Sequence, residues 1–327
     1  MKERGGICVT SSGLMKMEGL DVFLGAPVCR PPVFLRPQNI EFVAGWGVKK
    51  SGKKAESLAM RWGVQPLHLE DGFLRSVHPG RKSRPYALVR DHAGIYYDTT
   101  RPSDLENLLN AQVDVLSGIA DDVARARRMI ITHRLSKYNH APHLSQSHLK
   151  SSDSRRILVV DQTVGDTSIA KGSANGATFD QMLRAALDED QSATVYVKTH
   201  PEVTNGTKKG YFSELKESKR IVLLRDAVNP ISLVLEMDSV FTVTSTMGFE
   251  ALLAGKPVSC FGIPWYSGWG VTDDRQFCSR RNRSRSVDEL FAAAYFHYTR
   301  YINPATKQLG SIFDLMDWLI SQKATNM

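Results

Sequence analysis

The sequence predicts an α/β protein made of two Rossmann-like halves, and three observations lead to this prediction. In the first half of the chain, short apolar runs alternate with amphipathic helical patterns. A polar segment, residues 140–156, then has the composition of a linker. Beyond it the alternation resumes, as expected for a second sheet of parallel strands crossed by helices.

In the first half, strands are expected where apolar runs end in turns or polar loops: Glu41–Gly47, Pro66–Arg75 (a strand running into a loop), Tyr86–Arg90 and Gly94–Tyr97. Helical spacing of apolar residues predicts the helices Lys53–Trp62, Pro102–Asn110 and Asp114–His133.

The second half has the same kinds of signal. The predicted strands are Ile157–Val160, Thr194–Lys198, Ile221–Leu224, Ser239–Val243 and Val258–Phe261. The predicted helices are Thr178–Leu187, Pro230–Glu236, Gly248–Leu253, Val287–Tyr298 and a final amphipathic helix, Ile312–Ser321. We therefore expect one domain over residues 1–150, a second over 151–310, and a C-terminal helix, 311–327, that packs back on the first.

Composition and charge indicate which partners and which compartment the protein can have. The 327 residues carry a net charge of +8, which favours an anionic partner such as a nucleotide, an acidic sugar or an anionic lipid surface. The four cysteines have no metal-ligand spacing and suit a reducing compartment. We expect no signal peptide and no membrane span, hence a cytoplasmic protein or one peripheral to a membrane.

Several motifs are missing from the sequence. It has no dinucleotide-binding G-x-G-x-x-G loop after the first strand of either half, no Walker motif, no zinc spacing and no nucleophile elbow. These absences count against NAD-linked redox chemistry, P-loop hydrolysis and a zinc centre. Nucleic-acid binding is suggested only by the basic charge and ranks last.

The loop after the strand Ile157–Val160 carries two carboxylates, Asp161 and Asp166. Ligands of parallel α/β sheets bind beyond the carboxyl ends of the strands, so this loop is a candidate site. The alternative is that both acids only cap turns or the next helix. On this segment alone the two interpretations are equally good.

Two further loops add candidates for phosphate and ribose. Lys198 and His200 follow a strand that Pro201 ends, and both side chains can bind a phosphate, although the histidine could equally be structural. Thr244, Ser245 and Thr246 precede a helix whose N-terminus is suited to an anion. Glu250 could accept hydrogen bonds from ribose, or it could belong to a capping box.

Candidates for binding a sugar acceptor come from three segments. Glu70, Asp71 and Arg75 lie in the loop after a strand, where a tight Asp-Gly turn with surface charges is the alternative. The segment Ser136–Asn139 precedes the linker. The aromatic loop Pro264–Gly270 could pack against sugar rings or could fill space locally.

Together these segments resemble the bacterial capsule polysaccharide β-Kdo transferases, KpsC and its relatives. The resemblance rests on pieces in family order along nearly the whole chain: Gly45–Gly47, Leu69–Ser76, Gly94–Asp98, Ser136–Asn139, Val160–Thr163, Gly165–Asp166, Lys198–Pro201, Thr244–Ser245, Gly248–Pro257 and Tyr266–Gly270.

The resemblance implies a GT-B fold, with an inter-domain cleft and a C-terminal helix that crosses back. It implies a CMP-β-Kdo donor, no metal, and a β-Kdo-terminated glycolipid of the phosphatidylglycerol type as acceptor. It also implies a retaining reaction and peripheral contact with the cytoplasmic face of the inner membrane. Val159–Thr163 looks like the N-terminal module, which makes the β-(2→4) linkage. The chain is one module long, so it is either a truncated form or a single-module member.

Roles for individual residues follow from the resemblance. Asp166 aligns with the nucleophile of a double displacement, and Asp161 would support it without contacting the substrate. Glu70 is the candidate that orients or deprotonates the acceptor hydroxyl. The donor would be held by His200, Gln162, Lys198, Pro201, Thr244, Ser245, Thr246 and Glu250. The acceptor would be held by Asp71, Arg75, Lys137, Tyr138, Asn139, Trp265, Tyr266 and Trp269.

Two alternatives remain open at this point. An inverting transferase of the same fold, or a sugar-nucleotide epimerase, would keep the phosphate and ribose residues but need no nucleophile at Asp166. A non-catalytic glycan-binding or scaffold module would need none of these acids for chemistry.

Overall fold

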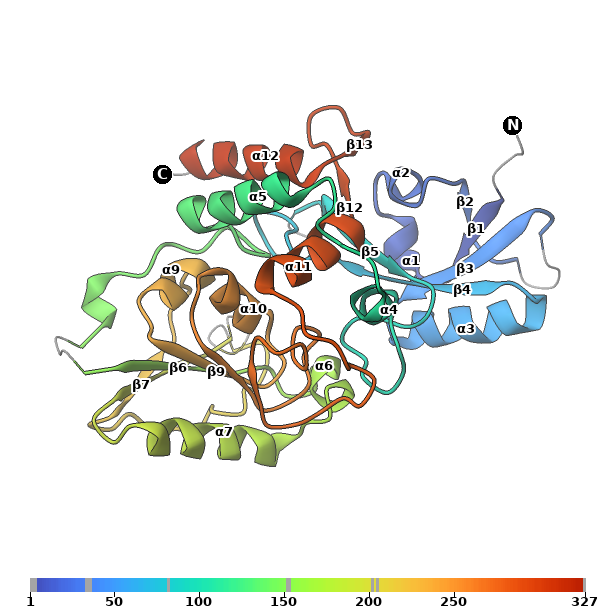
Figure 1. Cartoon of the computed structure of the whole chain (residues 1–327). Coiled ribbons are helices and arrows are strands. Elements are labelled where there is room, and N and C mark those ends of the chain that lie inside the picture. The colour runs from blue at the N-terminus through green and yellow to red at the C-terminus, as the bar shows by residue number, and fades with distance from the viewer. Residues whose placement is uncertain are drawn as a thin grey trace. The chain divides into compact units, whose positions relative to one another are not determined.

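The computed structural model describes residues 5–32, 37–80, 83–150, 154–200, 203 and 206–325. It divides the chain into two compact α/β units (Figure 1). Unit 1 comprises Met1–Ala120, Lys137–Asn139 and Phe291–Met327, and unit 2 comprises Asp121–Ser136 and His140–Leu290. Two units rich in parallel strands confirm the predicted α/β class.

Unit 1 is built on a seven-stranded sheet, counted over the described residues, in the order β13-β12-β5-β4-β3-β1-β2. The strands from β2 to β4 pair in parallel, and β5, β12 and β13 are antiparallel. The strands are β1 (Gly6–Val9), β2 (Val28–Cys29), β3 (Ile40–Trp46), β4 (Gln65–Asp71), β5 (Ala87–Asp91), β12 (Thr299–Ile302) and β13 (Leu309–Gly310). Its helices are α1 (Ser12–Met15), α2 (Leu20–Leu24), α3 (Lys50–Trp62), α4 (Asp104–Asn110), a π-helix (Ala292–His297) and α12 (Ile312–Thr325).

Unit 2 is built on an all-parallel sheet in the order β11-β10-β9-β6-β7-β8. Its strands are β6 (Arg156–Val160), β7 (Thr194–Lys198), β8 (Ile221–Leu224), β9 (Ser239–Thr242), β10 (Val258–Cys260) and β11 (Asp273–Asp274). Its helices are α5 (Ala120–His133), a 3-10 turn (Gln146–His148), α6 (Thr167–Lys171), α7 (Gly176–Glu189), α9 (Pro230–Leu235), α10 (Thr246–Leu253) and α11 (Val287–Phe291).

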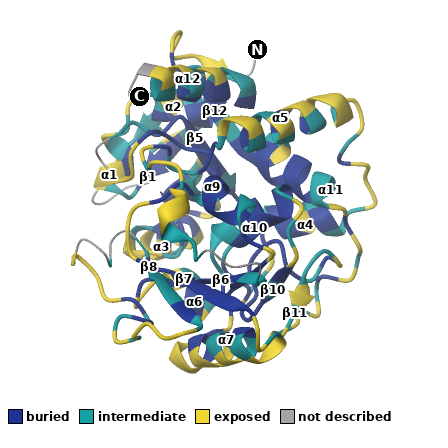
Figure 2. Ribbon diagram, turned by 90° about the vertical axis from the view of Figure 1, so that its left-hand side faces the viewer, coloured by how far each residue is buried: buried dark blue, intermediate teal, exposed yellow. Residues whose placement is uncertain are grey.

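The cores follow from these layers. In unit 2, α7 covers one face of the sheet, and α9 and α10 cover the other (Figure 1). The central strands β6 and β7 are buried on both faces, whereas α7 keeps an exposed side (Figure 2). This explains why β6 is a continuous apolar run and α7 is amphipathic. In unit 1, α3 packs on β3 through Ala55, Leu58 and Ala59.

The observed units group two segments differently from the expected boundaries at residues 150 and 310. Most of α5 belongs to unit 2, where the Arg127 guanidinium donates to the Leu253 carbonyl and pairs with Asp288 at 2.8 Å. The chain joins unit 1 from Phe291 onward because β12 pairs with β5. The C-terminal helix α12 belongs to unit 1 as well, where Trp318 packs against Tyr86.

Several element predictions were wrong. Gly94–Tyr97 forms a turn, since the Asp91 carboxylate accepts hydrogen bonds from the N–H groups of Ala93 and Gly94 and bends the chain. The helix expected from Asp114 begins at Ala120, because Gly118 has φ +74°, which a helix cannot accommodate. The segment ending at Tyr298 changes from α- to π-helix at Ala292.

Candidate functional site

Three neighbouring strands of unit 2 end at one edge of the sheet and bring the predicted donor residues together. β6 lies between β9 and β7, so the loops that follow these strands are adjacent. The loop after β6 carries Asp161, Gln162 and Asp166, the loop after β7 carries His200, and the turn after β9 leads into α10. The three loops therefore lie at the same edge of the sheet.

Gln162 ties the first of these loops to the third. Its side-chain oxygen accepts a hydrogen bond from the Thr244 backbone N–H at 2.9 Å, and its amide nitrogen donates to the Thr244 hydroxyl at 3.0 Å. The Ser168 hydroxyl lies 3.2 Å from the same Thr244 oxygen. Gln162 and Thr244 thus hold the edge in one shape, and both side chains already have protein partners.

Asp161 is buried at the end of β6, 2% exposed. One carboxylate oxygen accepts hydrogen bonds from the N–H groups of Gln162, at 2.8 Å, and Tyr211, at 3.0 Å. Burial raises the pKa of Asp161 to about 6, although these hydrogen bonds and the nearby Lys198 act in the opposite direction. The Asp161 carboxylate thus joins the loop after β6 to Tyr211.

Lys198 has a different environment from the one its sequence position suggested. Its ammonium group is buried and donates to the backbone carbonyls of Thr199, at 2.6 Å, and Leu224, at 3.3 Å. Burial lowers the pKa of Lys198 to about 8, against the opposing influence of Asp226 and Asp161. His200 follows at the strand end and is half-buried, whereas Pro201 lies outside the described residues.

Asp166 is exposed at the end of the same loop. Gly165, with φ +85°, turns the chain so that Asp166 becomes the N-cap of α6. One of its carboxylate oxygens accepts a hydrogen bond from the Ser168 N–H at 2.9 Å. The two carboxylates of the loop therefore have different surroundings, since Asp161 is enclosed by backbone donors and Asp166 faces solvent.

The start of α10, where the sequence predicts an anion site, carries a side-chain cap. Ser245 is the N-cap and its hydroxyl accepts from the Met247 N–H at 3.3 Å. Glu250 lies one turn further on, past the N3 position held by Gly248, so it does not complete a capping box. Glu250 is buried and accepts a hydrogen bond from the Ser136 hydroxyl at 2.5 Å.

The aromatic loop Pro264–Gly270 corrects one prediction. Trp265, Tyr266 and Trp269 are all buried, at 5% exposure or less, and pack inside unit 2. The Tyr266 hydroxyl donates to the Ser245 carbonyl at 2.6 Å, and Trp265 packs on Phe249 of α10. Their ring faces are used for packing and not as an open platform for sugar rings. The loop instead supports the N-terminus of α10.

In unit 1, Glu70 and Asp71 are the last residues of β4. Burial raises the pKa of Glu70, an effect reduced by the positive charges of Lys49 and Lys137. One Glu70 oxygen lies 3.4 Å from the Tyr97 hydroxyl, which donates to it. A carboxyl group with a raised pKa is suited to accept a proton from a substrate.

Asp71 is held by an ion pair, because Arg75 approaches its carboxylate to 2.7 Å. Arg75 is buried and also donates to the Ser76 hydroxyl, at 2.8 Å, and to the Gly80 carbonyl, at 3.1 Å. The sequence alternative of a tight turn with surface charges is thereby excluded. Asp71 and Arg75 instead fix the loop that follows β4.

The short segment Lys137–Asn139 returns to unit 1 and pairs with this loop. Tyr138 forms a parallel bridge with Ser76, and the Asn139 side-chain amide donates to the Ser76 carbonyl at 3.1 Å. Burial acts to lower the pKa of Lys137, but the nearby tyrosines and the carboxylates of Asp71 and Glu70 outweigh it, so that the pKa is raised. Lys137 therefore stays positively charged beside two acids.

The structure adds residues that the sequence did not single out. The Tyr97 hydroxyl donates a hydrogen bond to Glu70, and Tyr96 contributes to the raised pKa of Lys137. Gly47, with φ +40°, leaves room for them, since a Cβ at this position would lie 2.1 Å from the Tyr97 hydroxyl. The pieces Gly45–Gly47 and Gly94–Asp98 of the resemblance were the available signal, but neither suggested that the two segments touch.

The described residues contain neither a helix long and apolar enough to cross a membrane nor a group of side chains arranged to hold a metal ion.

Comparison with known proteins identifies the family. The family model described as "Capsule polysaccharide biosynthesis protein" matches residues 41–302. The chain belongs to this family. It is 47% identical over 298 residues to the "Capsule polysaccharide modification protein LipA" of Neisseria meningitidis serogroup A, a match that covers 88% of this chain and 42% of that protein. The chain thus spans less than half the length of this relative.

Two solved structures are similar over almost their full length. One is the "Thermosulfurimonas dismutans KpsC, beta Kdo 2,4 transferase", with a TM-score of 0.92 and 43% identity, covering 98% of this chain and 99% of that one. The "beta Kdo 2,7 transferase" of the same protein has a TM-score of 0.66 and 27% identity at the same coverage. The resemblance to the KpsC family predicted from the sequence is confirmed.

Proposed function

We propose that this chain is a glycosyltransferase that moves Kdo from CMP-β-Kdo to a β-Kdo-terminated glycolipid, forming a β-2,4 linkage with retention of configuration. The observation that carries the proposal is the likeness to the 2,4 transferase structure, at a TM-score of 0.92 against 0.66 for the 2,7 transferase. The product would belong to the lipid-anchored linker of a capsule polysaccharide, as the family suggests.

In the first displacement, an Asp166 carboxylate oxygen attacks the anomeric carbon of Kdo, and the bond from that carbon to the phosphate oxygen of CMP breaks. CMP leaves with the bonding electrons as a stable anion, without a metal ion. His200, Ser245 and the positive end of the α10 dipole stabilise the phosphate. The exposed position of Asp166 supports this role.

The other donor residues have supporting roles. Glu250 accepts hydrogen bonds from the ribose by exchanging its contact with Ser136. Gln162 and Thr244 keep the loops in register through their mutual hydrogen bonds. Asp161 and Lys198 hold the neighbouring backbone, Asp161 at Tyr211 and Lys198 at Thr199 and Leu224. The proposed donor-binding residues also include Thr246, the first residue of α10, and Pro201, which follows His200 in the sequence.

In the second displacement, Glu70 accepts the proton of the acceptor hydroxyl, whose oxygen attacks the same anomeric carbon and releases the Asp166 carboxylate. Two inversions give net retention. The raised pKa of Glu70 supports this assignment. Lys137, Tyr138 and Asn139 bind the acceptor beside Glu70, and Asp71 and Arg75 fix the loop on which they rest. The enzyme would work in the cytoplasm, in peripheral contact with the inner membrane that holds the lipid.

The proposal is tested by incubating the protein with CMP-β-Kdo and a short β-Kdo glycolipid and determining the linkage in the product by NMR. A β-2,4-linked product is expected. An α-linked product would contradict retention, and epimerised donor without transfer would indicate the epimerase alternative. Binding of acceptor with no turnover of either substrate would indicate a glycan-binding module.

A further inference from the structure

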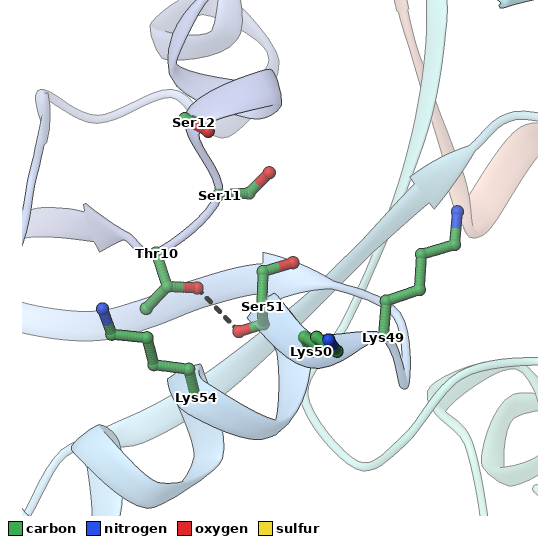
Figure 3. Close-up of a pocket in the computed structure, with 7 residues that line it drawn as sticks. All are labelled: Thr10, Ser11, Ser12, Lys49, Lys50, Ser51 and Lys54. Carbon is green, nitrogen blue, oxygen red and sulfur yellow. Dashed lines mark hydrogen bonds between the residues drawn. The ribbon is translucent and has the colours of Figure 1, made fainter.

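Unit 1 contains a pocket that the proposed reaction leaves without a role. It has a volume of about 460 Å³ and lies where β1 and β3 end (Figure 3). We call it the lysine pocket. Its lining residues are Thr10, Ser11, Ser12, Lys49, Lys50, Ser51 and Lys54.

The position of this pocket in the sheet is one where ligands bind. From β1 the chain moves outward to β2 on one side, and it then returns to form β3 and β4 on the other side. All of these neighbours pair in parallel. The order of the strands therefore reverses between β1 and β3, and crevices at such a reversal, beyond the carboxyl ends of the strands, are the usual ligand sites of α/β sheets.

The charge of the pocket indicates that its ligand is an anion. Three of its seven lining residues are lysines, all exposed, and none of the seven is acidic. Among the described residues none of these three ammonium groups has an ion-pair partner. The pocket also receives the N-terminus of the 13-residue helix α3. The first turn of this helix contains no acidic residue, and its N-cap makes no side-chain hydrogen bond. Both features favour an anion.

The floor of the pocket is held together by hydrogen bonds. The Thr10 hydroxyl donates to the Ser51 carbonyl at 2.7 Å and to the Ala44 carbonyl at 3.0 Å, which ties the end of β1 to the start of α3 (Figure 3). The Ser51 hydroxyl accepts from the Trp46 N–H at 3.1 Å. Gly45 allows this close approach, because a Cβ there would lie 2.3 Å from the Ser51 carbonyl oxygen. The lysines thus project from a preformed frame.

The pocket lies one strand away from the acid that we assign to the acceptor, because β3, at whose end the pocket lies, pairs with β4, which carries Glu70. Lys49 lines the pocket, and its positive charge lowers the pKa of Glu70 against the larger effect of burial. An anionic group bound by the lysines would therefore lie on the side of unit 1 that carries Glu70.

We propose that the lysine pocket binds an oxyanion of the acceptor, either the phosphate of its lipid headgroup or the carboxylate of a Kdo residue. This inference rests on the proposed function for the identity of the acceptor. It assigns to unit 1 an electrostatic subsite that selects acidic acceptors, in addition to the groups that contact the reacting hydroxyl.

The test is the double variant Lys50→Gln/Lys54→Gln, with Lys53→Gln as matched control, since Lys53 is an exposed lysine of the same helix that does not line the pocket. The KM for a β-Kdo acceptor on a phosphoglycerol lipid should rise about tenfold or more in the double variant, with kcat and the donor KM unchanged. Lys53→Gln should match the parent protein. An unchanged acceptor KM, or an equal rise in the control, would overturn the proposal.

A second acceptor, with the same sugar on a neutral alkyl chain, identifies the anion. A rise in KM for the phosphoglycerol acceptor alone assigns the phosphate, and a rise for both assigns the carboxylate. If the parent protein transfers Kdo to neither acceptor, the proposed function fails while the pocket can still be tested. Titration with glycerol 3-phosphate and with free Kdo should then shift the amide NMR signals of Ser51 and Gly52 in the parent protein only. If neither compound shifted these signals, the proposal that the lysine pocket binds an oxyanion would be overturned.

Discussion

Each unit carries a pair of carboxylates where a strand ends, and in each pair one acid is bound by the protein while the other is accessible for chemistry. In unit 2, Asp161 is enclosed by backbone N–H groups, whereas Asp166 is exposed at the cap of α6. In unit 1, Asp71 is paired with Arg75. Within the described part of the chain, Glu70 has hydrogen bonds only from the Tyr97 hydroxyl, at 3.4 Å, and from the Asp71 N–H, at 3.2 Å.

The two accessible acids differ in their surroundings, and the difference matches their proposed roles. Asp166 is exposed on a loop, so an anomeric carbon can approach it without rearrangement of the protein. Glu70 is placed among tyrosines and a lysine, and burial raises its pKa, as suits a group that must take up a proton. In the proposed mechanism, acids near the ends of strands would thus serve as the nucleophile in one unit and as the base in the other.

The largest effect is expected for Asp166→Asn. Turnover should fall at least about a thousandfold, because the amide cannot form the glycosyl-enzyme. Asparagine is as good an N-cap as aspartate, so the midpoint of thermal unfolding should stay unchanged. Initial rates and thermal unfolding of the same preparation measure both. Retained turnover in the folded variant would exclude Asp166 as the nucleophile.

Glu70→Gln should lower transfer to the acceptor by about a hundredfold to ten-thousandfold while leaving release of CMP in the first step intact. In the parent protein the rate should fall as the pH drops through the raised pKa of Glu70, because only the ionised carboxylate accepts a proton. In the variant this fall in rate at low pH should be absent. Pre-steady-state measurement of CMP release separates the steps, and an equal loss in both would assign Glu70 a structural role.

Asp161→Asn tests whether the buried acid of unit 2 is structural. The folded-state pKa of about 6 lies above the ordinary 3.8, so the folded protein binds this proton more tightly than the unfolded chain does. The stability that Asp161 contributes is therefore present below pH 3.8 and is lost as the pH rises through 6.

Asparagine carries no such proton. The free energy of unfolding of the variant, relative to the parent, should thus increase by on the order of 2 to 3 kcal/mol between about pH 4 and pH 7. Urea unfolding of both proteins at several pH values measures this change. If the difference in unfolding free energy between variant and parent did not depend on pH, the pKa of Asp161 would not be raised in the folded state.

The smallest effect is expected in the frame around Glu70. Gly47→Ala should destabilise the protein by about 2 kcal/mol more than Gly63→Ala, because both glycines have positive φ but only the new Cβ at position 47 meets the Tyr97 hydroxyl. Thermal unfolding of the two variants isolates the clash. Equal losses would show that Tyr97 moves freely and does not position Glu70.

The sequence predicted most of the strands that position the site, because buried parallel strands are uninterrupted apolar runs; Thr194–Lys198 and Ile221–Leu224 match β7 and β8 in full. It failed where tertiary contacts decide the outcome. The run Gly94–Tyr97 has strand composition, yet Asp91 bends it into a turn that delivers Tyr97 to Glu70. The aromatic loop has the composition of a sugar platform, yet its rings are consumed in packing beneath α10.

Sequence patterns also did not predict some short segments. The strand Gly6–Val9 was not predicted, although Thr10, which follows it, lines the lysine pocket. Pairing of Lys137–Asn139 with Ser76 joins segments about sixty residues apart in the chain, which no local signal specifies.

The central claim, that Asp166 forms a covalent bond to Kdo, is tested most directly by mass spectrometry of the protein incubated with CMP-β-Kdo alone and quenched in acid. The account predicts a peptide heavier by one Kdo residue, with the added mass on Asp166, and no such peptide from Asp166→Asn. Added mass on Asp161, or release of CMP with no protein-bound Kdo at any time point, would contradict it.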